Sequence, residues 1–288
     1  MRRSCIAFCG LGAMLLLIFA AARPAHADDW SKSYKVTGRP TLRVITNDGH
    51  VDLYNSSSSQ IDAHVTSNGW PIGDSGVRIT ESQNGNEVEL QVHVPTFHWS
   101  FGWNNRSVRI ELNVPREADL DIETGDGSVT SQAFRGQLRI STGDGNIEAE
   151  GLAGQVRLHS GDGHIRGTDF DGELRADSGD GRIDVSGRFD TLSLESGDGS
   201  VTAEAQSGSK LANDWSIRSG DGSVTLRLPD GLNADLDAHT GDGHITLENF
   251  SITTSGEISG STIHGKIGSG GPPLVVHTGD GSIHISKI

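Results

Sequence analysis

The chain has 288 residues, a formal net charge of −15, 39 glycines and two cysteines. This acidic balance argues against nucleic acid and anionic membranes as partners, because both carry negative charge. Cys5 and Cys9 both lie near the N-terminus, so the rest of the chain offers no disulfide, thiol nucleophile or thiolate metal site.

Residues 1–27 have the features of a secretory signal peptide. Arg2 and Arg3 precede an apolar run, and Ala25-His26-Ala27 is a small-x-small cleavage site. We therefore predict an exported protein that resides in the periplasm, at the cell surface or in the medium. An uncleaved N-terminal anchor is the alternative, because the apolar run reaches the lower length limit for a bilayer span. No second such run follows, so no membrane span is expected in the mature chain.

Residues 28–118 are predicted to form a less regular N-terminal β region that caps the remainder. The segments TLRVITNDGHVDLY (41–54), VRITESQNGNEVELQVHVP (77–95) and SVRIELNVP (107–115) alternate apolar and polar residues, as half-buried strands do. Thr46 to Val51 matches an imperfect first copy of the repeat that follows. This region is expected to merge into that repeat.

Four aromatic residues alternate in the segment FHWSFGW (97–103): Phe97, Trp99, Phe101 and Trp103. In a strand they would share one face. A flat aromatic strip beside Asn104, Asn105 and Arg106 is suited to stacking on sugar rings, which makes the four residues a candidate ligand-binding site. A hydrophobic lid over the open end of the repeat array is the alternative, and the sequence favours it.

Residues 119–288 contain eight copies of the phrase Ser/Thr-Gly-Asp-Gly-x-Ile/Val. The first glycines of successive copies are separated by 18, 18, 18, 18, 23, 21 and 38 residues. The last step is close to two periods and suggests a degenerate copy in between. A regular period of this kind indicates stacked structural units.

Each copy predicts two short strands that flank a glycine-rich corner, because apolar and polar residues alternate on both sides of it. We predict an all-β parallel β-solenoid, or β-helix-like fold, of roughly 18–23-residue repeats. The corner glycines are expected to supply positive φ angles. An antiparallel hairpin meander is the alternative, because Asp-Gly between alternating strands also favours hairpins.

The inward-facing residues are predicted to form apolar columns that only stacking of copies keeps dry. The first five copies supply Leu120, Ile122, Val129, Leu138, Ile140, Ile147, Val156, Leu158, Ile165, Leu174, Ile183, Val185, Leu192, Leu194 and Val201. A second column contains Phe134, Leu152, Phe170 and Phe189. Single copies are not expected to fold alone.

The aspartates of the eight copies should lie in a column along one edge. They are Asp126, Asp144, Asp162, Asp180, Asp198, Asp221, Asp242 and Asp280. Stacked carboxylates repel one another, and calcium would relieve this repulsion through oxygen ligands. The alternative, which the sequence favours, is that each aspartate hydrogen-bonds its own turn and no metal is needed.

Histidines flank two of the corners, His159 with His164 and His239 with His244. Imidazoles beside an aspartate are suited to a transition metal. Their spacing fits no known ligand motif, so solvated polar positions are the favoured interpretation.

The chain resembles the bacterial exported putative-adhesin family, a domain-of-unknown-function family of β-strand repeat proteins. The matching features are the segment Leu42 to Leu53, the strands that end at Pro95 and Pro115, and the Thr-Gly-Asp-Gly-x-Val copies after them. The resemblance implies a β-helix-like fold and an envelope or secreted location. It brings no active-site residues.

From these features we predict a non-enzymatic interaction scaffold whose partner is an envelope protein or a surface glycan. A carbohydrate-active β-helix enzyme and a calcium-loaded structural module are the alternatives. The final segment, Ser282 to Ile288, would leave an open sheet edge and so allow end-to-end self-association.

Overall fold

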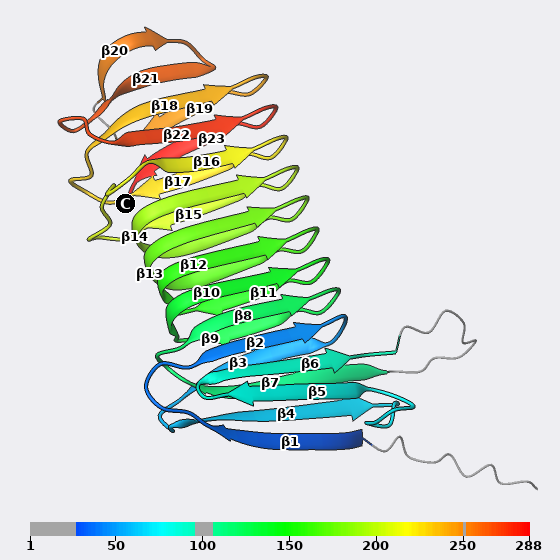
Figure 1. The fold of residues 1–288 in the computed structure, drawn as a ribbon. Helices are drawn as coiled ribbons and strands as arrows, with labels where there is room; N and C mark the ends of the chain where they lie inside the picture. Colours follow the sequence, from blue (N-terminus) through cyan, green and yellow to red (C-terminus); the bar gives the residue numbers. More distant parts are fainter. Residues whose placement is uncertain (1–26, 96–105, 250–251) are drawn as a thin grey trace, which may run out of the picture.

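A computed structural model describes residues 27–95, 106–249 and 252–288, and all regular elements in these ranges are β-strands. The strands stack one above another along an elongated rod (Figure 1). Residues 1–26 of the predicted signal peptide lie outside the described ranges. The described residues contain no helix with the length and apolar character needed to cross a membrane.

Each repeat copy contributes one strand before its corner and one after it; we call these two strands a rung. Strands before the corners include β8 (Asp119–Thr124), β10 (Arg135–Thr142) and β12 (Ala153–Ser160), and strands after them include β9 (Val129–Gln132) and β11 (Ile147–Glu150). In β13 (Ile165–Ser178) and β14 (Ile183–Ser196), the second strand of one copy continues into the first strand of the next. The stacked first strands form the first face of the rod, and the stacked second strands form the second face.

Neighbouring rungs pair in parallel and in register. Ile140 lies between Ile122 and Leu158, and Ile147 lies between Val129 and Ile165. Equivalent residues of successive copies are therefore direct neighbours, as in a β-solenoid. The antiparallel hairpin meander does not occur in these copies.

The last copies do not stack in sequence order. The strands concerned are β15 (Val201–Ala205), β16 (Trp215–Ser219), β17 (Val224–Leu228), β18 (Ala234–Thr240), β19 (Ile245–Glu248), β22 (Pro273–Thr278) and β23 (Ile283–Lys287). β22 lies between β16 and β18, and β23 lies between β17 and β19. The eighth copy therefore fills a slot between the sixth and the seventh copies (Figure 1).

Two sequence-based expectations about this end are wrong. The segment between the last two copies holds no degenerate rung but β20 (Ile252–Ile258) and β21 (Thr262–Ile267), with β21 antiparallel to β18 and to β20. The C-terminal strand β23 is not an open edge, because it is paired on both sides. It therefore offers no edge for end-to-end self-association.

The N-terminal end repeats this out-of-order arrangement. Its strands are β1 (Ala27–Lys35), β2 (Thr41–Thr46), β3 (His50–Ser56), β4 (Gln60–Asn68), β5 (Arg78–Asn84), β6 (Glu87–His93) and β7 (Ser107–Pro115). β2 lies between β6 and β8, and β3 lies between β7 and β9. The imperfect copy at Thr46 to Val51 therefore stacks on the first full copy.

Antiparallel strands cover this end. β4 pairs with β7, β1 pairs with β4, and β5 pairs with β6. The predicted boundary at residue 118 falls between β7 and β8, and strands from both sides of it, such as β2 and β8, pair directly.

The buried residues form one apolar cluster along the rod. Every residue predicted to face inward is buried, including Phe134, Leu152, Phe170 and Phe189. Phe189 contacts Phe170 and Trp215 with ring centroids 6.4 and 6.2 Å apart. Burial of such side chains contributes about 1.5–3 kcal/mol each, so neighbouring rungs stabilise one another.

The corner glycines are required by close stacking and not by positive φ. Among the described residues, only Gly49 of the imperfect copy combines a corner position with a positive φ, of 115°. A Cβ on the second glycine of any of the eight corners would lie 1.8–2.3 Å from a carbonyl oxygen of the neighbouring rung. The expectation of positive φ at the Gly-Asp-Gly corners is therefore wrong.

The Ser or Thr before each corner joins neighbouring rungs through its hydroxyl group. All eight are buried, as is Thr46 in the imperfect copy. Ser160 Oγ accepts a hydrogen bond from Gly163 N at 2.9 Å and donates one to Gly145 O of the preceding rung at 3.0 Å. The same donation recurs from the second copy to the eighth, at 2.7–3.1 Å. We call this column the hydroxyl ladder.

Replacing Ser160 with Ala should destabilise the protein by about 2 kcal/mol, because a buried N–H and a buried carbonyl lose their partner. The measurement is urea denaturation of the purified chain. Ser193→Ala is the control, since Ser193 lies half-buried on the first face and its side chain makes no hydrogen bond with any described residue; its effect should stay below about 0.5 kcal/mol. Equal effects of the two variants would show that the hydroxyl ladder does not stabilise the stack.

Gly163→Ala should cost about 3 kcal/mol or more, because its Cβ would lie 2.0 Å from Gly145 O. Gly260→Ala is the matched control, since no atom lies within 4 Å of a Cβ at that position. Thermal unfolding followed by circular dichroism measures both. A tolerated Gly163→Ala would contradict the close-stacking explanation of the corners.

Candidate functional site

The stacked corners place the eight aspartates along one edge of the rod, which we call the corner edge. Each aspartate is exposed. Backbone bonds hold the corners together: Asp162 N donates to Gly143 O at 3.1 Å, and Asp180 N donates to Gly161 O at 3.2 Å. Parallel strands lie about 4.8 Å apart, so the corner edge carries closely spaced negative charges.

These carboxylates do not hydrogen-bond their own turns. In the part of the chain that the structure describes, none of the eight accepts a hydrogen bond or forms an ion pair. Only Asp48 of the imperfect copy does so, with Oδ1 2.6 Å from Gly49 N. The serine or threonine hydroxyl, which sequence reasoning missed, makes the bond that had been expected of the aspartate.

No arrangement of the described side chains supports metal binding at the corner edge. Among the described residues, no group of three or more His, Cys, Asp or Glu side chains is arranged to hold a metal ion. Calcium at Asp126, Asp144, Asp162, Asp180, Asp198, Asp221, Asp242 and Asp280 stays a prediction.

The corner histidines bond to neighbouring rungs. His159 Nδ1 lies 2.5 Å from Asp177 Oδ1. His164 Nδ1 accepts a hydrogen bond from Arg182 N at 3.0 Å, and His239 Nδ1 lies 3.0 Å from Thr262 Oγ1. These three imidazoles therefore make local contacts on the rod surface.

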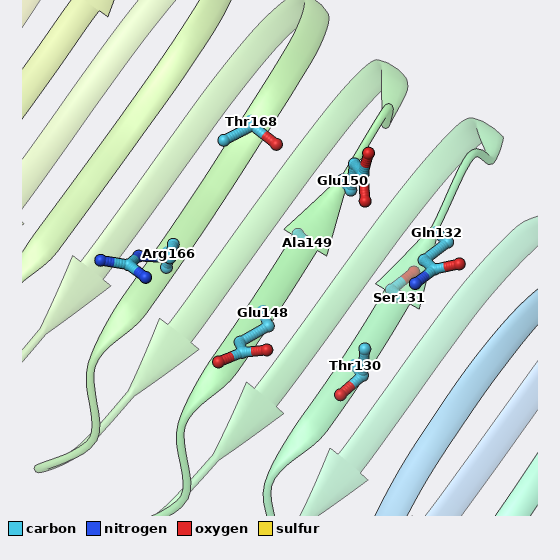
Figure 2. A pocket seen from close by; sticks show the side chains of 8 residues that line it. All are labelled: Thr130, Ser131, Gln132, Glu148, Ala149, Glu150, Arg166 and Thr168. Carbon is cyan, nitrogen blue, oxygen red and sulfur yellow. The ribbon is translucent and has the colours of Figure 1, made fainter.

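A shallow depression of about 190 Å³ lies on the second face, across β9, β11 and β13. Figure 2 shows Thr130, Glu148 and Arg166 side by side on these three strands, with Gln132, Glu150 and Thr168 farther along them. The direct cross-strand neighbours of Glu148 are Thr130 and Arg166, and those of Glu150 are Gln132 and Thr168. Neither glutamate of the depression therefore has a carboxylate directly opposite it on an adjacent strand.

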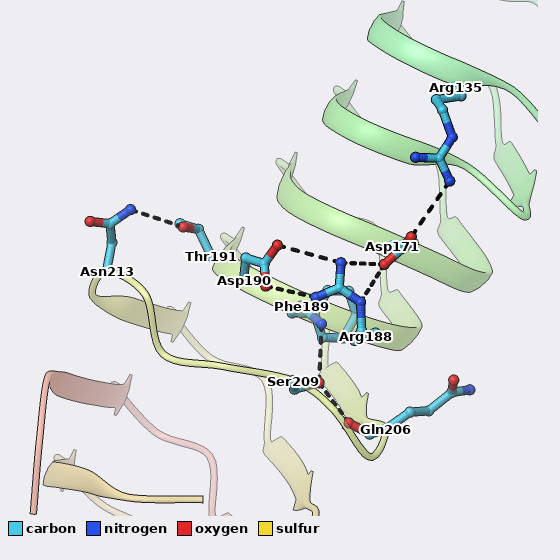
Figure 3. A network of polar contacts seen from close by, with 9 residues as sticks. All are labelled: Arg135, Asp171, Arg188, Phe189, Asp190, Thr191, Gln206, Ser209 and Asn213. Carbon is cyan, nitrogen blue, oxygen red and sulfur yellow. Dashed lines mark hydrogen bonds and ion pairs between the residues drawn. The ribbon is translucent and has the colours of Figure 1, made fainter. Parts of the chain in front are cut away.

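An ion-pair network joins β13 and β14 (Figure 3). Arg188 Nη1 donates to Asp190 Oδ1 at 2.7 Å, and Arg188 also pairs with Asp171. Hydrogen bonding to Asp190 is the main cause that raises the pKa of Arg188, with a further contribution from Asp171. This network is a structural brace.

Separate hydrogen bonds anchor the inserted loop that lengthens one repeat. Phe189 N donates to Ser209 Oγ at 3.0 Å, and Ser209 Oγ donates to Gln206 O at 2.7 Å. Asn213 Nδ2 reaches Thr191 Oγ1 at 3.3 Å. The loop thus stays close to the rod and leaves the stacking of the rungs intact.

The aromatic residues Phe97, Trp99, Phe101 and Trp103 lie outside the described residues. Their segment connects β6 to β7, the position that a corner occupies in other rungs. Asn47 joins the end of β6 to the neighbouring corner, since Asn47 Nδ2 donates to Val94 O at 2.8 Å and Val94 N donates to Asn47 Oδ1 at 2.7 Å. The described strand that precedes the aromatic segment is therefore held at the corner edge.

The family model Toastrack DUF4097 matches residues 42–286. A search of curated proteins finds no match to the chain. Among solved structures, a putative lipid binding protein from Parabacteroides distasonis ATCC 8503 is 14% identical with a TM-score of 0.50, over 91% of this chain and 98% of that chain.

A putative cell adhesion protein from Clostridium sporogenes ATCC 15579 is 14% identical with a TM-score of 0.33, over 91% of this chain and 100% of that chain. A putative adhesin from Bacteroides fragilis NCTC 9343 is also 14% identical, with a TM-score of 0.36, over 90% of this chain and 97% of that chain. At such identities, the likeness to the Parabacteroides distasonis protein concerns the fold alone.

Asp162→Asn should stabilise the protein by about 1 kcal/mol at low ionic strength, because it removes repulsion from Asp144 and Asp180 on the adjacent rungs. The gain should shrink in 1 M salt, where the screening length is about 3 Å. Asp74→Asn, at an exposed loop position, should change stability little. The melting temperatures of the unsubstituted protein and of the two variants, at low and at high salt, measure these effects.

Two outcomes would contradict this account of the corner edge. Destabilisation by Asp162→Asn would show that the carboxylate stabilises its turn. A melting temperature of the unsubstituted protein that rises from EDTA to millimolar calcium, with a smaller rise in Asp162→Asn, would establish the calcium site.

Proposed function

Because the chain belongs to the Toastrack DUF4097 family, we propose that it is an exported, non-enzymatic interaction scaffold of the adhesin-like kind. The observation that carries this proposal is the regular exposure of the two faces. Inward and outward residues alternate along the rungs, and in-register pairing aligns the outward residues of successive copies. A long surface with regularly spaced side chains suits an extended partner better than a small enclosed substrate.

The stacked copies constitute a parallel β-solenoid of roughly 18–23-residue repeats, with residues 28–118 as its N-terminal β region. The signal-like segment at residues 1–27 supports export to the periplasm, the cell surface or the medium. The partner would be an envelope protein or a surface glycan.

We assign the aromatic run the role of a sugar contact. Aromatic faces beside amide and guanidinium groups combine a flat apolar surface with hydrogen-bond donors, which sugar rings require. The segment follows β6 in the sequence, and the end of β6 is hydrogen-bonded to Asn47 of the neighbouring corner.

Trp99→Ala should abolish saturable changes in tryptophan fluorescence when the purified chain is titrated with envelope and extracellular polysaccharides, because a stacking surface is lost. Its melting temperature should equal that of the unsubstituted protein. A fall in melting temperature would instead support the lid. A flat response of the unsubstituted protein across the panel would reject the sugar contact and direct the search to protein partners.

A further inference from the structure

One outward column on the first face has an unusual order of charges. In-register pairing aligns the following residues from the N-terminal end: Glu89, Arg43, Asp121, Arg139, Arg157, Arg175, Ser193 and Ser216. The first four alternate between acid and base. The alternation then stops, and three arginines follow one another on adjacent strands. We call Arg139, Arg157 and Arg175 the arginine ladder.

Among the described residues, only the arginines in the N-terminal part of this column form ion pairs with acidic residues. Asp121 lies 3.7 Å from Arg43 Nε and 3.9 Å from Arg139 Nε, so one carboxylate is shared by two guanidinium groups. Arg157 and Arg175 form no ion pair with any of the described residues. Like charges directly opposite each other on neighbouring strands are destabilising, so the stack gains nothing from this arrangement.

The arginine ladder borders a depression of about 300 Å³, which Ser141, His159 and Asp177 also line. Asp177 is the one carboxylate in this lining, and His159 Nδ1 lies 2.5 Å from its Oδ1. The depression is therefore lined mainly by hydrogen-bond donors and positive charge. Guanidinium groups bind carboxylate, sulfate or phosphate oxygens through two parallel hydrogen bonds.

On the second face, the arginines Arg166 and Arg227 have acidic neighbours. Arg166 lies between Glu148 and Asp184 in its column, and Arg227 Nη1 lies 3.1 Å from Glu204 Oε2. Figure 2 shows Arg166 beside Glu148 on the neighbouring strand. The same rungs therefore alternate opposite charges on one face and align like charges on the other.

We propose that the arginine ladder is a binding site for a linear acidic glycan, one that carries a carboxylate or sulfate on successive sugars. Parallel strands place the guanidinium groups at intervals of about 4.8 Å along the rod, which suits a polymer with regularly spaced anions. The ladder is one residue wide on a chain of net charge −15. A broad anionic membrane would meet that negative charge, whereas a single polymer chain follows the ladder alone.

This site deepens the proposed scaffold function and rests on it in so far as the partner is a glycan. It uses other residues than the aromatic run, because the arginine ladder lies on β10, β12 and β13 and the aromatic run lies between β6 and β7 in the sequence. An acidic glycan and a neutral glycan can therefore be tested independently.

The test measures binding of polygalacturonate and of neutral dextran to the purified chain by biolayer interferometry. The unsubstituted protein should bind polygalacturonate, with an affinity that falls as salt is raised, and should bind dextran at least tenfold more weakly. The double variant Arg157→Gln/Arg175→Gln should lose about tenfold in affinity for polygalacturonate, since each exposed ion pair contributes about two- to fivefold. Arg166→Gln should bind within twofold of the unsubstituted protein.

The double variant should melt at or above the temperature of the unsubstituted protein, because it removes like-charge contacts; lost binding then does not reflect unfolding. Equal binding by the double variant, or equal loss in Arg166→Gln, would overturn the proposal. Binding to phosphatidylglycerol vesicles but not to polygalacturonate would overturn it in favour of a lipid surface. Binding to a neutral polysaccharide that depends on Trp99, without polygalacturonate binding, would reject the arginine site alone and leave the scaffold function standing.

Discussion

The structure depends on how closely the corners of neighbouring rungs approach each other. A carbonyl oxygen of one corner occupies the space that a side chain of the next would need, within 2.3 Å of the Cβ position at the second glycine. Glycine is therefore fixed by the stack and not by the local turn. The hydroxyl ladder follows from the same approach, because only a short side chain such as that of Ser178 can bond both its own turn and Gly163 O next to it.

In-register stacking aligns the equivalent outward residues of successive rungs in columns along the rod. Because equivalent residues are direct neighbours, charge either alternates along a column, as at Arg166, or accumulates, as at Arg157 and along the corner edge. Accumulation costs stability. The hydroxyl ladder and the continuous apolar core offset this cost, which leaves the surface free to carry unpaired charge of either sign.

Much of the fold was predictable, because alternation and spacing are local signals. The sequence predicted the inward columns, the imperfect copy at Thr46 and the solenoid-like stacking of the copies. It missed the role of the hydroxyls, since Ser160 and its equivalents look like ordinary turn residues until the neighbouring carbonyl is in place. The arginine ladder was visible as separate outward arginines, but their adjacency requires the register. The order of the terminal rungs could not be predicted, because each rung matches either neighbour equally well.

The out-of-order rungs explain how so regular a stack comes to an end. A rung whose strands had an unpaired edge would present the template that every other copy recognises. At the C-terminal end, Thr240 N donates to Ser261 O at 3.0 Å and Ile245 N donates to Gly260 O at 2.9 Å, so the β20–β21 connection occupies the corner of the seventh copy. At the other end, antiparallel β4 and β5 flank the outermost rung. Among the described strands, β1, β5, β19 and β20 at the two ends each pair on one side only, whereas the unpaired charges of the arginine ladder and of the corner aspartates lie along the sides of the rod.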